Sequence, residues 1–468
     1  MPDPVVLVGP QRSYRRTELD ADIAGLAAEL AERGAGPGRR VALMSSNRPE
    51  FVVALYAVWR LGAAVVLLSP AWKSGEVRHA LELTGADIAV GDHPVLAEQL
   101  PMRHLDEPIA ADPHAPPPPA PDPGDEAVLV FSSGTTGLPK AVRHTHGSFG
   151  AAVAHWRTVL ALTDRDRMQI ATPPSHILGL LNIATMLDVG GWLRLHRRFD
   201  IDALLAGIET DRITVEMAVA PIALAIAAHP ELERFDLSSL RYLMWCATPV
   251  TAAVAETVTR RTGVCWLTAY GSTELPVLAC NEIGSGRLDT VGRAAPGVRL
   301  RAVRPDGTAA PVGEPGEIWA AADSLMAGYL PDSATAEAVT DGWYHTGDIG
   351  VFDDGGWLQI TDRSKEMIKV RGFQVAPAEV EAVLHGHPAV ADCAVFGVPA
   401  GADGERVIAA VSRGAEVSAA ELIDLVDSRL AGYKRPAEIV FVPEIPRLPS
   451  GKVLRRVLKE RHGCPIDK

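Results

Sequence analysis

The segment FSSGTTGLPK, residues 131–140, gathers hydroxyls, glycines and one cation at the end of the apolar run EAVLVF. Gly134 and Gly137 let the backbone turn and approach a ligand closely, because glycine tolerates conformations that other residues avoid. Lys140 supplies a positive charge, and hydroxyl groups add donors beside the backbone N–H groups. The hydroxyl-bearing residues are Ser132, Ser133, Thr135 and Thr136. Together these groups could bind the phosphates of a nucleotide.

The loop differs from a Walker A motif, which reads G-x-x-x-x-G-K-[ST]. Here Gly137 is followed by Leu138 and Pro139 before Lys140. Composition alone also permits a plain turn rich in serine and glycine, without a ligand. Other motifs along the chain therefore have to decide between the two interpretations.

Five further motifs follow the loop. They are YGSTE at 270–274, GEIWAAADSLMAGYL at 316–330, GWYHTGD at 342–348, DRSKEMIKVRGFQVAPAEVE at 362–381 and LPSGK at 448–452. In this order, and over nearly the full chain, they resemble the adenylate-forming superfamily of acyl-CoA synthetases, luciferases and peptide-synthetase adenylation domains. The stretch IKVRGFQVAPAEVE is most similar to coumarate–CoA ligases and related aryl- or fatty-acyl-CoA ligases.

The resemblance implies an enzyme that uses ATP, Mg²⁺ and CoA. In this family a carboxylate attacks the α-phosphate of ATP to give an acyl-adenylate, and a thiol then displaces AMP. The first step brings an anion against a polyanion, so positive charge and hydrogen-bond donors must offset the repulsion. The resemblance assigns Thr136 and Glu274 to Mg²⁺ and the phosphates, and Lys452 to the reacting centre. Taken alone, Glu274 and Lys452 could equally be solvated surface charges.

The resemblance also assigns the adenine and ribose sites. Tyr270 offers a flat face for adenine, Gly271 leaves room for a close ligand, and Thr273 belongs to the same motif. Asp348 has two oxygens that can accept from both ribose hydroxyls, and Arg363 is expected to donate to the same sugar. Without the motifs, a buried strand-end tyrosine and a surface turn would be the ordinary explanations of these residues.

The last hundred residues are expected to move as a unit. The resemblance places a hinge at Lys365, so that residues 1–363 form the adenylation core and residues 364–468 a mobile domain. One face of this domain would present Lys452 for adenylation, and the other would bring KVRGF, residues 369–373, to the thioester step. One cavity cannot suit both reactions, so a rotating domain exchanges the catalytic groups. The residues assigned to the CoA step are Lys369, Arg371 and Gly372.

The acid-binding pocket is expected to be mainly apolar. The resemblance assigns to it His176, Trp245, Cys246, Ala247 and Pro276. Cys246 stands where relatives usually have glycine, so its larger side chain should shorten or reshape the cavity. The segment SHILGLLNI lacks the aspartate with which amino-acid adenylation domains hold an ammonium group. These features predict an aryl or aliphatic carboxylic acid as the substrate.

Two alternatives to a CoA ligase remain open from the sequence. An acid-adenylating enzyme could load the phosphopantetheine of an acyl or peptidyl carrier protein, since KVRGF is compatible with either acceptor. A catalytically silent nucleotide-binding protein could keep the same fold. The joint presence of all charged groups of the site argues against silence: Lys140, Glu274, Asp348, Arg363 and Lys452.

Regular elements must position these motifs. Up to about residue 270, helix-like and strand-like patterns alternate, interrupted by a proline-rich connector at 112–124, and Thr17 is expected to cap the first helix. The chain then becomes strand-rich and ends in a small unit with helices at 377–384 and 419–430. This order predicts an α/β protein. Its large N-terminal domain has layered, mostly parallel sheets with helices and a strand-rich subdomain, followed by a small mobile α+β C-terminal domain.

Composition restricts the class of protein. The 468 residues carry a net charge of −13 with scattered basic residues, which argues against nucleic acid or an anionic membrane surface as a partner. The most apolar stretch, residues 217–228, is too short to span a bilayer. Five cysteines without metal-type spacing, and an N-terminus without a signal-peptide pattern, predict a cytoplasmic enzyme with reduced thiols.

Overall fold

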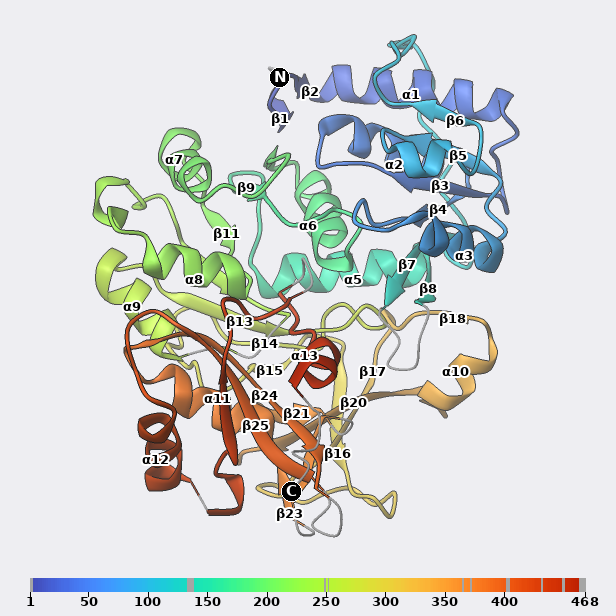
Figure 1. The fold of residues 1–468 in the computed structure, drawn as a ribbon. Helices are drawn as coiled ribbons and strands as arrows, with labels where there is room; N and C mark the ends of the chain where they lie inside the picture. Colours follow the sequence, from blue (N-terminus) through green and yellow to red (C-terminus); the bar gives the residue numbers. More distant parts are fainter. Residues whose placement is uncertain are drawn as a thin grey trace.

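The computed structural model describes residues 3–132, 139–247, 250, 252–363, 366–370, 373–400, 405–430, 432–447 and 451–462. Of residues 362, 363, 369, 373 and 374 only the backbone is described. Figure 1 shows the N-terminal elements, blue to cyan, at one end of the molecule and the elements after residue 366, orange to red, at the other. The predicted α/β class, with a large N-terminal part and a small C-terminal unit, is confirmed.

A first sheet carries most strands between residues 40 and 145, including both ends of the phosphate-loop segment. Its described strands are β3 (Arg40–Met44), β4 (Ala64–Leu67), β5 (Ile88–Gly91), β6 (Met102–His104), β7 (Glu126–Ser132), β8 (Lys140–Thr145) and β18 (Gly328–Leu330). They lie in the order β18-β8-β7-β4-β3-β5-β6. The strands from β7 to β6 are parallel, as the alternating pattern predicts, whereas β8 and β18 are antiparallel additions at one edge. Its helices are α1 (Arg16–Glu32), α2 (Pro49–Arg60), α3 (Ser74–Thr84) and α4 (Pro94–Ala97).

A second sheet carries the middle of the chain. Its described strands are β1 (Val5–Val8), β2 (Ser13–Arg15), β9 (Arg167–Ile170), β10 (Trp192–Leu195), β11 (Val215–Met217), β12 (Tyr242–Trp245), β13 (Trp266–Tyr270), β14 (Ala279–Cys280) and β15 (Arg293–Ala294). The order is β15-β14-β13-β12-β11-β9-β10-β1-β2, with a parallel run from β13 to β1. The helices in this part of the chain are α5 (His146–Val159), which also contacts β7 and β8 of the first sheet, α6 (Ile177–Asp188), α7 (Ile201–Asp211), α8 (Ala220–Ala228) and α9 (Ala252–Thr262).

The strand-rich subdomain follows residue 295, as predicted. Within the described ranges it consists of β16 (Arg299–Val303), β17 (Gly316–Ala321), β19 (Val339–Thr340), β20 (Trp343–Phe352) and β21 (Leu358–Arg363). These strands pair antiparallel throughout. One helix, α10 (Ser333–Ala338), connects β18 of the first sheet to β19, so this segment joins two sheets.

The C-terminal unit has its own apolar core, built around residues such as Val380, Val395 and Val411. The described elements are β22 (Ile368–Val370), β23 (Phe373–Val375), α11 (Pro377–His385), β24 (Val390–Pro399), β25 (Glu405–Arg413), α12 (Ala419–Arg429), β26 (Glu438–Phe441) and α13 (Arg455–His462). The two expected helices at 377–384 and 419–430 are therefore present. The hinge at Lys365 lies outside the described residues, and the boundary between 363 and 364 stays a prediction.

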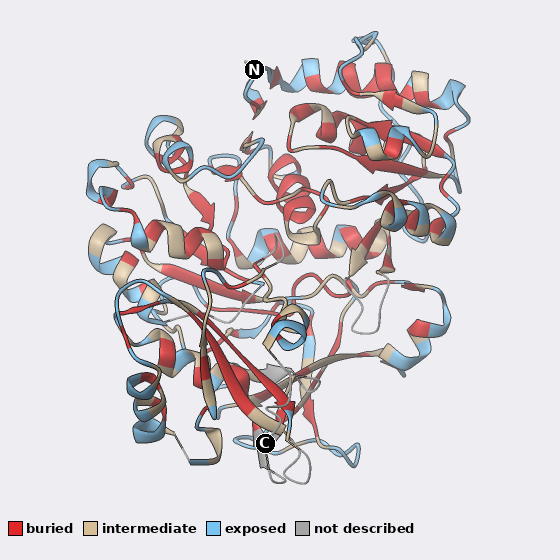
Figure 2. Cartoon of the chain, in the orientation of Figure 1, coloured by how far each residue is buried: buried red, intermediate tan, exposed pale blue. Residues whose placement is uncertain are grey.

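Burial follows the layers. Figure 2 shows red, buried strands covered by helices whose outer faces are pale blue. Helix α6 differs, because residues on every side of it are buried, including Leu180, Asn182 and Ile183.

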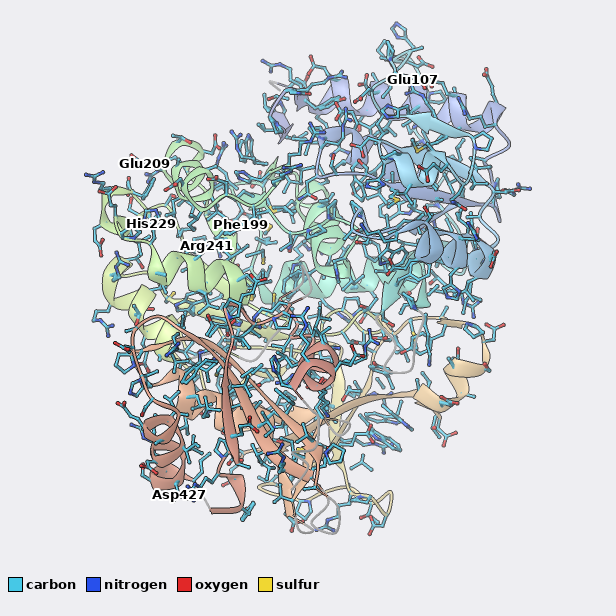
Figure 3. The ribbon with its side chains drawn as sticks, in the orientation of Figure 1. Glu107, Phe199, Glu209, His229, Arg241 and Asp427 are labelled. Carbon is cyan, nitrogen blue, oxygen red and sulfur yellow. The ribbon has the colours of Figure 1, made fainter. Side chains whose placement is uncertain are left out.

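Figure 3 labels His229 and Arg241 on the flank of the second sheet. His229 Nε2 lies 2.9 Å from an oxygen of Asp202, and Arg241 pairs with Asp166 at 2.7 Å.

The cap of the first helix differs from the expectation. Helix α1 starts at Arg16, and its N-cap is Arg15, whose backbone N–H donates to the Glu18 carboxylate at 2.9 Å. Thr17 lies inside the first turn, where its hydroxyl donates to Asp3 at 2.6 Å. The expected cap was wrong because an acidic residue upstream binds the threonine.

No helix among the described residues is both long enough and apolar enough to cross a membrane.

A buried carboxyl group lies within the second sheet. Glu216 on β11 is 1% exposed, and Gln169 on β9 donates to its Oε2 across 2.7 Å. The side-chain oxygen of Gln169 lies 2.7 Å from His196 Nε2, so the line of polar contacts continues to the residue that follows β10. Burial raises the pKa of Glu216 to about 8, because the charged form would lose its hydration.

We expect this carboxyl group to make stability depend on pH. Its folded pKa of about 8 exceeds the ordinary value of 4.5, so the folded chain keeps a proton that the unfolded chain releases. The contribution to stability is complete below the unfolded pKa and falls by about 1.4 kcal/mol per pH unit until the folded pKa is reached. Urea unfolding of Glu216→Gln, which cannot ionise, should show a flatter pH dependence than the natural chain. Equal slopes in the two proteins would contradict the assigned pKa.

Candidate active site

The two arms of the phosphate loop are neighbouring strands. Ser132 ends β7 and Lys140 begins β8, and the two residues face each other in the antiparallel register. The tip of the predicted loop lies outside the described residues, namely Ser133, Gly134, Thr135, Thr136 and Gly137. The structure therefore places the base of the loop, and the phosphate contacts of its tip stay a prediction.

The YGSTE motif follows β13 and meets β20 of the strand-rich subdomain. The Tyr270 hydroxyl donates to Asp348 Oδ2 across 2.6 Å. Asp348 is only 5% exposed, so this hydrogen bond fixes both the phenol ring and the carboxylate. On the neighbouring strand β21, the backbone of Arg363 pairs with that of Asp348. The residues predicted to bind adenine and ribose are thus brought together.

Gly271 is required by the loop itself. A Cβ at this position would lie 2.0 Å from the carbonyl oxygen of Pro276 and 2.8 Å from its carbonyl carbon. Real side chains do not approach a backbone so closely. The glycine therefore lets the YGSTE segment fold against the segment that holds Pro276, and room for a ligand beside it stays a prediction.

Glu274 lies near Lys140, with a tyrosine between them. Glu274 is 7% exposed, and the hydroxyl of Tyr329 on β18 donates to its Oε1 across 2.8 Å. The Lys140 ammonium lies 5.6 Å from the centre of the Tyr329 ring, within the range of a cation–π contact. A nearly buried carboxylate next to the base of the predicted phosphate loop suits a hard cation such as Mg²⁺, which prefers oxygen ligands. The residues present therefore fit the implied magnesium site.

Three side chains of this region were not assigned from the sequence: Tyr329, Tyr344 and His144. Tyr344 is 6% exposed and lies beside Tyr329 and close to Glu274. His144 contacts the Thr273 carbonyl oxygen at 2.8 Å, and its burial lowers its pKa and favours the neutral ring. Both tyrosines lie inside segments that resemble motifs of the family. Their place in these segments was the only feature of the sequence that could have pointed to them.

The predicted acid-pocket residues follow the carboxyl ends of parallel strands in the second sheet. Such ends are where ligands bind in open α/β sheets. Trp245 ends β12 and Cys246 follows it, and both are buried. Burial raises the pKa of the Cys246 thiol to about 12, so this side chain behaves as a small apolar group. Ala247 has φ +67, a strained value of a kind that clusters at functional sites.

His176 borders the same region from the loop after β9. It is the N-cap residue of α6, and burial lowers its pKa, which favours the neutral imidazole. Pro276 is buried against Gly271 as described above. A separate cavity of about 570 Å³ lies between α1, α2, α5 and α6, and no predicted site residue lines it. We therefore place the candidate site at the strand ends and not in this cavity.

The segment around Lys452 is held in place by two arginines. Lys452 follows Gly451, whose φ is +85 and whose carbonyl oxygen accepts from Arg447 at 2.8 Å. Arg447 also pairs with Asp392 on β24 at 2.7 Å. Arg455, at the start of α13, pairs at 2.7 and 2.6 Å with two carboxylates, Glu366 and Glu381. Gly451 and Arg455, on either side of Lys452, are thus tied to β24 and α11 of the C-terminal unit.

The predicted CoA residues are only partly described. The backbone of Lys369 lies in β22 and pairs with residue 374 of β23. Arg371 and Gly372, like the hinge Lys365, lie outside the described residues. Their roles in the thioester step stay predictions.

Known proteins share both parts of the chain. The AMP-binding enzyme family matches residues 1–330, and the C-terminal domain of AMP-binding enzymes matches residues 379–452. A feruloyl-CoA synthase of Amycolatopsis sp is 35% identical over 470 residues, which cover 95% of this chain and 93% of the relative.

Two solved structures agree with this result. The amide bond synthetase McbA of Marinactinospora thermotolerans matches with a TM-score of 0.90 at 30% identity, covering 98% of this chain and 96% of that one. The o-succinylbenzoate–CoA synthetase MenE of Bacillus subtilis, solved with ATP and magnesium, matches with a TM-score of 0.87 at 29% identity, covering 98% and 97%. The chain therefore belongs to the family of AMP-binding, adenylate-forming enzymes that its motifs resemble.

Proposed function

We propose that this protein is an AMP-forming acid–thiol ligase that activates an aryl carboxylic acid with ATP and transfers the acyl group to CoA. The observation that carries the proposal is the grouping of Tyr270, Asp348, Glu274 and Lys140 around two further tyrosines. These groups offer an aromatic face, a sugar acceptor, a metal ligand and a phosphate cation in one region.

In the adenylation step the chain's own residues bind and orient the two anions. Lys140 and the loop donors hold the phosphates, while Asp348 accepts from the ribose hydroxyls. Glu274 and Thr136 would hold Mg²⁺, which would supply neutralisation of the phosphate charge. Lys452 would lower the repulsion between the α-phosphate and the acid. An acid is already ionised near neutral pH, so His176 borders the pocket and does not need to act as a base.

The acid is expected to be aromatic. The feruloyl-CoA synthase relative takes an aryl acid by name, and the pocket candidates of this chain are mainly apolar. Trp245 is fixed against Trp266 at 5.4 Å between ring centres, which makes this side of the region rigid. Cys246 should limit the depth of the pocket. We therefore expect small aryl or arylacrylic acids to be preferred over long aliphatic chains.

The acceptor is expected to be the thiol of CoA. The relatives named as CoA synthases or synthetases support this choice. McbA supports a second candidate, an amine that attacks the same acyl-adenylate and gives an amide. Loading of a carrier protein is the third possibility. All three acceptors attack the same carbonyl carbon and release AMP, so the adenylation half of the mechanism is common to them.

The compartment is expected to be the cytoplasm. Of the cysteines in the described part of the chain, Cys246, Cys265, Cys280 and Cys393 are all free thiols. Free thiols persist where the medium is reducing. Fractionation of the native host with antibody detection would test this assignment.

One screen tests the proposal. The enzyme is incubated with ATP, Mg²⁺ and a panel of aryl and aliphatic acids, and AMP release is measured with CoA, with simple amines or with holo-carrier proteins as acceptor. We expect AMP release with aryl acids to rise when CoA is added, and an acyl-CoA product by mass spectrometry. Amide formed in place of the thioester would favour the McbA-like reaction. Absence of pyrophosphate exchange with every acid would support the silent nucleotide-binding alternative.

A further inference from the structure

Two residues of the YGSTE motif are each held by a residue from the segment 329–348. Tyr270 donates to Asp348, and Glu274 accepts from Tyr329. Between them the chain turns, because the Ser272 N–H donates to the Leu275 carbonyl oxygen and the Leu275 N–H donates to the Ser272 hydroxyl. The motif is therefore fixed at two points, one on the adenine side and one on the metal side.

Tyr329 is itself held in one position. Its strand β18 pairs with β8, where Tyr329 faces Val142, two residues after Lys140. Its backbone N–H donates to the Thr335 hydroxyl at 2.9 Å, and its side chain is buried. The carbonyl oxygen of Glu274 in turn accepts from Met326 N at 2.8 Å, so β18 and its approach bind both the backbone and the carboxylate of Glu274.

The Tyr329 phenol acts as the donor in this contact, because an ionised carboxylate can only accept. The Tyr329 proton therefore points to Oε1 of Glu274. Tyr344 is buried beside Tyr329. One oxygen of Glu274 is thereby fixed, which leaves the second for a cation.

We propose that Tyr329, supported by Tyr344, is a positioning residue that orients the Glu274 carboxylate for the magnesium ion of the bound nucleotide. The proposal rests on the assignment of Mg²⁺ to Glu274 made above. Without the phenol, the carboxylate could rotate away from the cation. Because a hydrogen bond to a charged group is among the stronger ones, we expect its loss to weaken metal binding about tenfold.

The test compares Tyr329→Phe with the natural chain by two measurements. Pyrophosphate exchange is titrated with Mg²⁺, and binding of Mn²⁺ to the enzyme–ATP complex is followed by electron paramagnetic resonance. We expect the half-maximal Mg²⁺ concentration and the Mn²⁺ dissociation constant both to rise about tenfold. Binding of ATP in EDTA, measured by calorimetry, should be unchanged. Tyr344→Phe, which removes only the indirect support, should shift the metal constants in the same direction by a smaller factor.

Tyr242→Phe is the matched control, since the Tyr242 hydroxyl donates to the Leu160 carbonyl oxygen at 2.7 Å in the buried core away from the site. It should lower thermal stability and leave the metal constants unchanged. Unshifted metal constants in Tyr329→Phe would overturn the proposal, and Tyr344→Phe carries the same test if Tyr329→Phe does not fold. Glu274→Gln separates the two assignments. If it binds Mn²⁺ normally, the metal assignment is wrong, whereas a loss in Glu274→Gln without one in Tyr329→Phe rejects only the positioning role.

Discussion

Lys452→Ala should reduce the rate of adenylation by about 10²–10³, because a charge at the reacting centre stabilises the transition state by several kcal/mol. The thioester step should stay nearly intact, since the proposed domain rotation removes Lys452 from the site before the thiol attacks. Pyrophosphate exchange measures the first step, and acyl-CoA formation from chemically prepared acyl-adenylate measures the second. Because Arg447 and Arg455 hold the segment around Lys452, we expect the C-terminal unit of Lys452→Ala to stay folded, so that the loss of rate reports the missing charge.

Gly372→Trp provides the converse control. A large side chain on the opposite face should block the approach of the CoA thiol and leave adenylation intact. An equal loss in both steps for either variant would contradict the model in which two faces of the C-terminal domain alternate at one site.

Asp348→Asn should raise the KM for ATP by about 10–100-fold, with a smaller effect on the KM for the acid. The carboxylate is expected to accept from both ribose hydroxyls, and a hydrogen bond to a charged group contributes about 1.5–3 kcal/mol. The neutral amide offers a single acceptor oxygen and adds donors that oppose the hydroxyl protons. Initial rates over a range of ATP concentrations, with the acid saturating, measure the effect.

Tyr270→Phe is the control for this substitution. It removes the 2.6 Å hydrogen bond to Asp348 and keeps the aromatic face. If ribose binding depends on the carboxylate itself, this variant should raise the KM for ATP much less than Asp348→Asn. A larger effect of Tyr270→Phe would indicate that the tyrosine hydroxyl, and not the aspartate, contacts the nucleotide.

Much of the fold could be predicted because its signals are local. The alternation of helix and strand patterns before residue 270 gave the parallel sheets, and apolar spacing gave helices α11 and α12 within one residue at each end. Pairings between distant segments carry no such signal. Strand β18 joins β8 across nearly two hundred residues, and β1 pairs with the distant β10 as well as with its sequence neighbour β2. These choices depend on which sheet edge is free, which only the complete fold decides.

The residues of the site likewise fall into those that local motifs predict and those that depend on pairing between distant segments. The ordered motifs predicted Tyr270 and Asp348 as partners of one nucleotide; the structure brings the two side chains into a hydrogen bond, and their binding of a nucleotide stays a prediction. Tyr329 was quoted within a motif and received no role, since its contact with Glu274 exists only through the pairing of β18 with β8. A hydrogen bond between residues 55 positions apart has no counterpart in spacing. The supporting residues of a site are therefore harder to predict than those that resemble known motifs.

The close packing of Gly271 on Pro276 limits how such an enzyme can acquire a new substrate. The backbone expected to carry adenine and the backbone expected to border the acid are two sides of one layer, with no space for a methyl group between them. A change that widened the acid cavity by moving residue 276 would also move the backbone at Gly271, beside which the adenine is expected to lie. New acid preferences should therefore evolve by exchange of side chains on an unmoved main chain, at positions such as 245 and 246, and not by loop insertion near 276.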